Sequence, residues 1–334
     1  MNKILLLVFS LAMMFTSAHG ADWKFYGSAR VQTFVENYDN GNLADSQTYY
    51  DQYLQSNSRV GARVKVSEEL TARFEYGTEV NVRILYGEWN FGSGSLLVGQ
   101  TYSPLNMFYS NQVWWDDTNL FDFGGVYSGR NPMLRLKFGE FQIAVVQPST
   151  ESFFGGSTEV KIPKIEAKYM FSKENWHLQI AGGYNSFNVF SGGYEFDVDS
   201  YVVALGGGIN IGALYIQGSI RFGQNVGNYG LLNLPFDFAV FDWENDSHAY
   251  ILVAGYKIND MFSIETGLGY TQAELDHPLL QKDAEVAYYF QSTITLAPGV
   301  LIIPEIGFID WKTDMFGNNE GNTVYGGIKW QIDF

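Results

Sequence analysis

The chain has 334 residues, a formal net charge of −16 and no cysteine, and 17% of its residues are aromatic. The acidic balance argues against nucleic acid as a partner, because phosphate binding relies on clustered lysine and arginine. Without cysteine there are no disulfides and no thiol chemistry. The mean hydropathy of −0.09 fits a soluble protein and equally fits strands that alternate lipid-facing and water-facing residues. The periodicity of the sequence therefore has to decide the class.

The first 20 residues have the pattern of an export signal. Lys3 precedes an apolar run that extends from Ile4 to Phe15, and small residues at positions 18 and 20 precede a cleavage site before Ala21. An uncleaved helical anchor is the alternative, but the run is shorter than the roughly 20 apolar residues that cross a bilayer. We expect residues 1–20 to be removed and residues 21–334 to form a single domain.

Most of the remaining chain repeats one unit, a segment in which apolar and polar residues alternate. In the first such segment, residues 23–36, Phe25 and Val31 fall on one face and Lys24 and Gln32 on the other. A period of two is typical of a half-buried strand. Similar segments cover residues 59–66, 70–76, 81–91, 95–102, 133–138, 141–147, 161–171, 176–184, 200–211, 214–222, 248–258, 261–271, 284–296, 300–311 and 323–334.

The connections between these segments alternate between tight turns and longer polar loops, as in outer-membrane barrels. An unpaired backbone group costs several kcal/mol in hydrocarbon, so strands that cross a membrane must close into a barrel without edges. A soluble β-sandwich also alternates, but its strands are usually shorter and it has no systematic turn asymmetry. The sequence predicts an all-β, transmembrane, antiparallel β-barrel of about 16 strands.

The longest connection, residues 103–131, contains the sequence Asp122-Phe123-Gly124-Gly125. In this feature, in its strand pattern and in its aromatic C-terminal residue Phe334, the chain resembles the general bacterial porins. Their third loop folds into the lumen and carries an acidic residue followed by Phe-Gly-Gly. The resemblance implies that this long third loop also folds into the lumen here.

The resemblance further implies a pore constriction in which an acidic loop faces a basic wall. The acidic candidates on the loop are Asp116, Asp117 and Asp122. The basic candidates are Arg63, Arg83 and Arg135 on comparable strands, with Arg30, Arg59 and Arg73 extending the wall. Alternation independently places Arg63 and Arg135 on the polar faces of their strands. For each charged residue, a solvated position, an internal ion pair or a turn cap is the alternative.

Two tryptophans of the same loop, Trp114 and Trp115, have two interpretations. They form a stacking surface for sugars in the lumen, or they anchor the folded loop through their large apolar area. Scattered carboxylates and histidines form neither a zinc spacing nor a calcium loop, and nothing marks a nucleophile beside a base. We therefore expect no metal, no cofactor and no enzymatic activity.

The expected function is passive diffusion of small hydrophilic solutes and ions across the outer membrane of a Gram-negative bacterium. Charges of both signs would act across a gap comparable with the Debye length of roughly 8–10 Å, so salt would screen them only partly. The family is usually trimeric, which implies a homotrimer embedded in outer-membrane lipid. However, the second outward connection, around Gly77 to Glu79, is very short for a loop that latches a neighbour. The alternatives are a substrate-specific channel, for example for sugars, and a barrel enzyme or adhesin.

Overall fold

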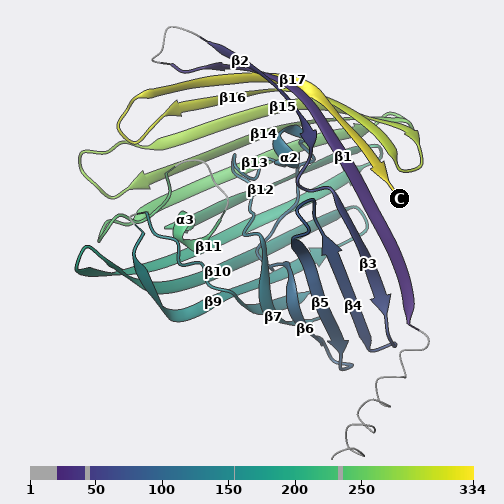
Figure 1. The fold of residues 1–334 in the computed structure, drawn as a ribbon, viewed down its shortest axis with the longest axis horizontal. Helices are drawn as coiled ribbons and strands as arrows, with labels where there is room; N and C mark the ends of the chain where they lie inside the picture. The colour runs from purple at the N-terminus through teal and green to yellow at the C-terminus, as the bar shows by residue number, and fades with distance from the viewer. Residues whose placement is uncertain (1–20, 42–45, 154, 232–235) are drawn as a thin grey trace, which may run out of the picture.

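The computed structural model describes residues 21–41, 46–153, 155–231 and 236–334, so the expected export signal lies outside the described residues. The strands form one antiparallel sheet that closes on itself as a barrel (Figure 1). The strands are β1 (Asp22–Asp39), β2 (Gln47–Leu54), β3 (Arg59–Lys65), β4 (Leu70–Tyr76), β5 (Val82–Asn90), β6 (Ser95–Tyr102), β7 (Arg130–Phe138), β8 (Phe141–Val146), β9 (Ser157–Ser172), β10 (Trp176–Ser191), β11 (Tyr194–Ile211), β12 (Leu214–Gln224), β13 (Asn245–Lys257), β14 (Phe262–Leu275), β15 (Asp283–Ala297), β16 (Val300–Thr313) and β17 (Asn319–Asp333).

Two of the 17 described strands share one position in the barrel wall. The upper half of β1 pairs with β2, from Val31 opposite Leu54, and its lower half pairs with β3, from Ser28 opposite Arg59. β2 and β3 therefore lie end to end along β1, and the wall has sixteen positions, as the sequence predicts. The sequence pattern identified β3 but not β2.

The barrel closes where the first strand meets the last. Twelve residue pairs join β1 to β17, from Ser28 opposite Asp333 to Asp39 opposite Asn322. Below this ladder, the Gly27 amide donates to the Phe334 carbonyl at 2.6 Å and the Phe334 amide donates to the Gly27 carbonyl at 3.1 Å. The C-terminal residue Phe334 thus extends the pairing between β1 and β17, which is the seam at which the barrel closes.

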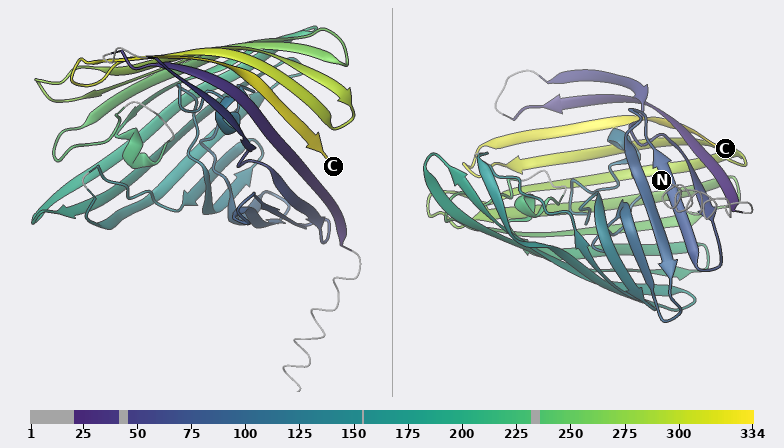
Figure 2. Two further views of the ribbon diagram at one scale, coloured as in Figure 1. Left: turned by 45° about the horizontal axis from the view of Figure 1, so that its top comes forward. Right: turned by 60° about the horizontal axis from the view of Figure 1, so that its bottom comes forward.

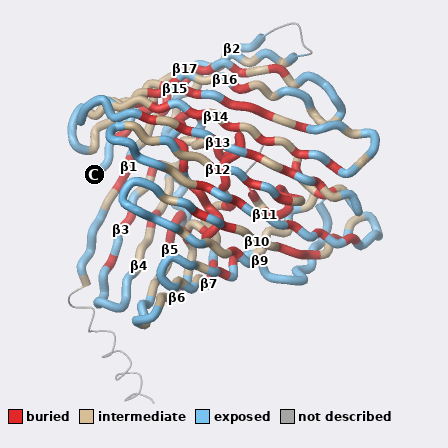
Figure 3. The backbone as a smooth tube through the Cα atoms, turned by 180° about the vertical axis from the view of Figure 1, so that it is seen from behind, coloured by how far each residue is buried: buried red, intermediate tan, exposed pale blue. Residues whose placement is uncertain are grey.

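The outer face of the barrel is apolar, as alternation predicts. Neighbouring strands place Val98, Leu134, Val145 and Ile165 opposite one another, and each of these side chains is between 39% and 55% exposed. Large apolar side chains that remain exposed in a continuous row are suited to lipid. Buried and exposed residues alternate along the long strands in Figure 3.

The wall is much lower on one side of the barrel. Strands β3 to β8 have six to nine residues each, whereas β9 to β17 have 11 to 18. Figure 2 shows the short strands beside the tall wall. Among the described helices, none is long and apolar enough to cross a membrane.

Two connections fold into the barrel and fill part of its lumen. The third loop, residues 103–129, contains the short helix α2 (Trp114–Asp117), and the β12–β13 connection contains α3 (Val226–Tyr229). Figures 1 and 2 show both helices enclosed by strands. They share an apolar core with the tall wall, which includes Phe34, Trp114, Phe123, Val226 and Tyr229. The open part of the lumen is therefore confined to the remaining cross-section.

Candidate pore constriction

Buried glutamates on the barrel wall hold the backbone of the third loop. Glu166 on β9 accepts from the Leu105 amide at 3.0 Å, and Glu265 on β14 accepts from the Asn111 amide at 3.0 Å. Glu305 on β16 accepts from the Val113 amide at 2.7 Å. A carboxylate that accepts from backbone amides makes a strong, charge-assisted hydrogen bond. The wall thereby fixes the path of the loop across the lumen.

Aromatic packing and a close backbone approach also hold the loop against the wall. The Trp114 ring stacks on Tyr325 of β17 with 4.8 Å between centroids, and its indole nitrogen donates to Glu36 at 2.6 Å. Gly124 has a φ of +111°, and a Cβ at this position would collide with the Tyr270 carbonyl oxygen. Only glycine combines this dihedral angle with so close a backbone approach. This is the physical reason for a glycine within the Phe-Gly-Gly motif.

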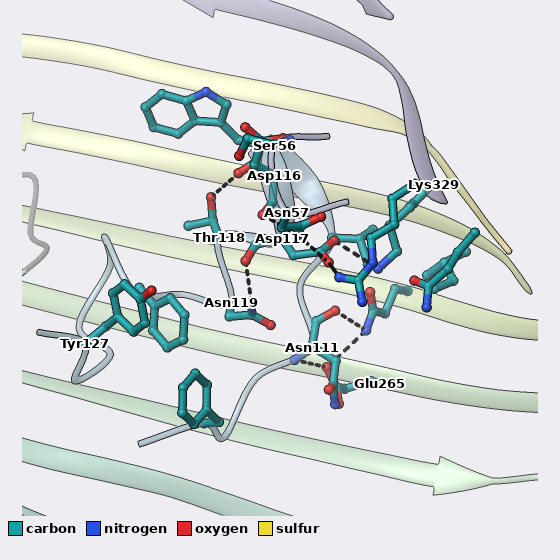
Figure 4. Close-up of a pocket in the computed structure, with 18 of the residues that line it drawn as sticks. Ser56, Asn57, Asn111, Asp116, Asp117, Thr118, Asn119, Tyr127, Glu265 and Lys329 are labelled. Carbon is teal, nitrogen blue, oxygen red and sulfur yellow. Dashed lines mark hydrogen bonds and ion pairs between the residues drawn. The ribbon is translucent and has the colours of Figure 1, made fainter. Parts of the chain in front are cut away.

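The tip of the loop is tied to the seam of the barrel through Asp116 and Asp117. Asp117 forms ion pairs with Arg30 of β1 at 2.5 Å and with Lys329 of β17 at 2.9 Å. Asp116 accepts from the Ser56 amide at 2.8 Å, in the break between β2 and β3. The break between the two strands therefore supplies a backbone donor for the loop tip, and Figure 4 shows Ser56 beside Asp116.

The loop tip has an unusual backbone conformation. Trp115, Asp116 and Asp117 have φ values of 45°, 62° and 58°. Left-handed conformations cost free energy in residues other than glycine and persist where the surroundings enforce them. The ion pairs of Asp117 and the hydrogen bond to Asp116 supply that enforcement.

A cluster of arginines on the low wall surrounds one carboxylate, Glu75 of β4. Arg73 and Arg83 each lie 2.9 Å from its oxygens, and Arg59 lies 3.9 Å away. The Tyr26 hydroxyl also donates to Glu75 at 2.8 Å. One negative charge thus orders three positive ones, and the cluster keeps a net positive charge.

Two other predicted basic residues occupy different positions. Arg63 on β3 is opposite Arg73, and its guanidinium lies 5.8 Å from the centre of the Tyr26 ring. Arg135 on β7 is opposite Leu97 and Ala144, and it does not line the cavity described below. The structure therefore brings Arg59, Arg63, Arg73 and Arg83 together, places Arg30 at the loop tip and leaves Arg135 apart. Of the six predicted basic residues, Arg30, Arg59 and Arg83 line the cavity, whereas Arg63, Arg73 and Arg135 do not.

Asp122 lies deeper in the loop than the other two acidic candidates. It is 5% exposed, and burial raises the pKa of its carboxyl to about 7. Burial disfavours the charged form of a carboxyl group. Asp122 consequently titrates near neutral pH.

The two tryptophans differ in their surroundings. Trp114 is 4% exposed and packs within the loop core, whereas Trp115 is 49% exposed and lines the lumen. Trp114 has the environment of an anchor. Trp115 has a face available to a solute.

One cavity of about 850 Å³ lies beside the third loop and is lined by residues of both the low wall and the tall wall. The loop contributes all three acidic candidates. The wall contributes the basic residues Arg30, Arg59, Arg83, Arg130 and Lys329 and one carboxylate, Glu265. Side chains of both signs therefore face the same open space. In the described part of the chain, no group of three or more histidine, aspartate or glutamate side chains is arranged to hold a metal ion.

Sequence reasoning missed several residues that shape this cavity. Glu75 lies two positions after Arg73 on the same strand face, so alternation contained the signal for it. Lys329 shares the polar face of the last strand, but nothing in the sequence brings it close to Asp117. The sequence has no recognisable pattern that places Arg130 at the cavity or the β12–β13 connection inside the barrel, because both positions depend on how the loops fold in space.

Comparisons with known proteins bear on the fold. No family model and no curated protein matches the sequence. Among solved structures, the outer membrane channel DcaP of Acinetobacter baumannii superposes with a TM-score of 0.77 at 16% identity, covering 95% of this chain and 98% of that one. The anion-selective porin from Comamonas acidovorans has a TM-score of 0.63 at 12% identity, covering 94% and 100%. OmpT, an outer membrane protein of Vibrio cholerae, in its trimer form has a TM-score of 0.60 at 15% identity, covering 94% and 99%.

The protein has the fold of the bacterial outer-membrane porins, a closed antiparallel barrel with sixteen wall positions. The resemblance drawn from the sequence is thus confirmed at the level of fold. At these identities, the solutes and partners of the similar proteins remain properties of those proteins.

Proposed function

We propose that the protein is an outer-membrane channel for passive diffusion of small hydrophilic solutes and ions, with a charged constriction between the third loop and the basic wall. The observation that carries the proposal is the cavity of about 850 Å³ lined by acidic loop residues and basic wall residues. Barrels of about 16 strands leave room for an aqueous passage. Charged rings or walls at a narrow point select solutes by size and charge.

Wall glutamates support the assignment of the third loop as the narrowing element. Glu166, Glu265 and Glu305 hold loop amides at distances from 2.7 to 3.0 Å. A loop held by three strands keeps its position while solutes pass, which a freely moving loop does not. The constriction would therefore have a defined width.

The proposal includes the compartment and the assembly. The apolar outer row on β6 to β9 requires lipid, and the export pattern at residues 1–20 directs the chain out of the cytoplasm. We place the mature protein in the outer membrane of a Gram-negative bacterium, without enzymatic activity. The similar OmpT fold has been solved as a trimer, and we propose a homotrimer here.

Liposome swelling tests the channel function. Proteoliposomes are diluted into isotonic solutions of uncharged sugars of increasing size, with protein-free liposomes as the control. A diffusion channel predicts swelling rates that fall steadily as the sugar becomes larger. Swelling no faster than in protein-free liposomes would contradict the proposal.

The same assay addresses the second candidate, a sugar-selective channel. The half-exposed Trp115 ring in the cavity favours it, because aromatic faces pack against apolar faces of solutes. A sugar-selective channel would pass one sugar out of order with its size. Trp115→Leu would then restore the order.

A further inference from the structure

A group of aromatic rings lines one side of the cavity, where a porin lumen is normally polar. Phe108 is at its centre, with ring centroids 5.0 Å from Tyr102, 5.6 Å from Phe121 and 6.2 Å from Tyr127. Phe121 and Tyr127 stack on each other at 4.5 Å. All four residues line the cavity.

Phe108 is 50% exposed, although it has three aromatic neighbours. Its contacts with those neighbours are all edge-to-face. This geometry is favourable between aromatic rings and adds about 0.5–1.5 kcal/mol per pair beyond apolar burial. The exposed part of Phe108 can therefore accept one more ring from a solute in the cavity.

A positive charge lies beside these rings. Arg130, the first residue of β7, is opposite Tyr102 in the sheet. Its guanidinium lies 5.4 Å from the centre of the Tyr102 ring, and Nη1 donates to the Tyr102 hydroxyl at 3.2 Å. Among the described residues, Arg130 takes part in no ion pair, unlike Arg30, Arg59, Arg73 and Arg83.

The other charges of the cavity leave Arg130 as its best anion-binding group. Asp117 is shared by Arg30 and Lys329, and Glu75 is shared by the three arginines of the low wall. The Arg130 guanidinium has five N–H donors in a planar fork that matches a carboxylate. Its side-chain hydrogen bond to the Tyr102 hydroxyl uses one of these donors and leaves others for a solute.

We propose that Tyr102, Phe108, Tyr127 and Arg130 form a binding subsite for small aromatic carboxylates on their way through the channel. The ring of the solute packs against Phe108, and its carboxylate binds Arg130. This inference rests on the proposed channel function and names a solute class for it. A carboxylate without a ring, or a ring without a charge, uses only half of the subsite.

Current block in planar bilayers tests the subsite. Single channels are recorded in potassium chloride, and potassium benzoate, cyclohexanecarboxylate, acetate or neutral benzamide is added to one side. Benzoate is expected to block the current most strongly. The apparent affinity for cyclohexanecarboxylate should be about two- to tenfold weaker, because this solute lacks the edge-to-face contact of one aromatic ring pair. Acetate and benzamide are expected to be weaker still. Equal block by benzoate and cyclohexanecarboxylate would overturn the aromatic part of the proposal.

Substitutions assign the effect to these residues. Phe108→Leu keeps an apolar side chain and is expected to abolish the preference for benzoate over cyclohexanecarboxylate. Arg130→Gln removes the charge and is expected to reduce block by both carboxylates. Phe316→Leu, at a residue that is 67% exposed and outside the cavity, is the matched control and should leave the order unchanged. An unchanged benzoate preference in Phe108→Leu would refute the site.

This experiment distinguishes a failure of the channel function from a failure of the subsite. Absence of current in potassium chloride alone would contradict the channel function. Normal current in potassium chloride, with no discrimination among the four probes, would overturn only the subsite. Where a variant gives no current, gel electrophoresis of heated and unheated samples shows whether it folded, because a folded barrel migrates differently from the unfolded chain. If Arg130→Gln does not fold, Arg130→Lys replaces it as the test. Arg130→Lys is expected to weaken the block by benzoate, because lysine lacks the planar fork.

Discussion

Single carboxylates carry much of the electrostatic organisation of this lumen. Glu75 holds three arginines, and Asp117 holds one arginine and one lysine. In both cases, the carboxylate orders cationic side chains that would otherwise repel one another. The net charge at each of these places is therefore the sum of the negative carboxylate and its positive partners.

Replacement of Glu75 by glutamine tests this organisation. Glu75→Gln removes one negative charge from the arginine cluster and should shift the reversal potential, measured across a potassium chloride gradient, toward anions. Loss of a buried partner costs about 3–5 kcal/mol, so we also expect a lower denaturation midpoint. Glu68→Gln, at a turn carboxylate that is 83% exposed, removes the same charge and should change neither quantity. Equal reversal potentials for the wild type and Glu75→Gln would refute the role of Glu75.

Asp122 predicts a pH dependence of ion preference. Its pKa is raised by burial to about 7, so the carboxyl is mostly neutral at pH 6 and mostly charged at pH 8. The added negative charge should lower the preference for anions as the pH rises through this range. Reversal potentials at the two pH values measure the effect, and Asp122→Asn should reduce the difference. A difference that persists unchanged in Asp122→Asn would assign the titration to another group.

At the scale of elements, alternation predicted most of the wall and little of what lies inside it. The outer face of each strand meets lipid along its length, so apolar residues recur with a period of two and the sequence contains the signal. The third loop was identified by its length and by one short motif. The β12–β13 connection was not, because its insertion depends on single contacts, such as Tyr229 with Glu166 at 2.9 Å and Lys164 with the Tyr229 carbonyl at 3.0 Å.

The strand β2 was missed for a related physical reason. It pairs with β1 and continues the line of β3, but its own residues, Gln47–Leu54, have tyrosines and polar side chains on both faces and so show no apolar alternation. In the break between β2 and β3, Ser56 and Asn57 turn toward the loop tip and bind Asp116 and Asp117. The sequence pattern therefore revealed neither β2 nor the role of Ser56 and Asn57, because that role depends on the fold of the third loop.

The insertion of the β12–β13 connection depends on a glycine of the wall. A Cβ at Gly183 of β10 would collide with the Tyr229 hydroxyl, so Gly183→Ala should displace Tyr229 and widen the lumen. We expect a larger single-channel conductance and a loss of stability of about 1–3 kcal/mol, typical of overpacking. Gly182→Ala is the matched control, since the nearest atom to its added Cβ is the Val202 carbonyl oxygen at 3.2 Å. Equal conductance in the two variants would show that the connection does not limit the passage.

At the scale of the whole molecule, total charge and local charge point in different directions. The chain carries a formal charge of −16, whereas the low wall inside the lumen is basic. A solute at the proposed constriction would lie within a Debye length of the local groups, so those groups would dominate over distant surface charge. The overall composition therefore did not reveal the charge of the passage, although the positions of the arginines on strand faces gave part of it.

Single-channel recording in planar bilayers, with a potassium chloride gradient across the membrane, is the most direct test of whether the barrel is a channel narrowed by the third loop. We expect stepwise currents, and a reversal potential that moves toward anions when Asp116→Asn and Asp122→Asn are combined on the third loop. Folded barrel that inserts into the bilayer without stepwise current, or a double variant with the reversal potential of the wild type, would contradict this expectation.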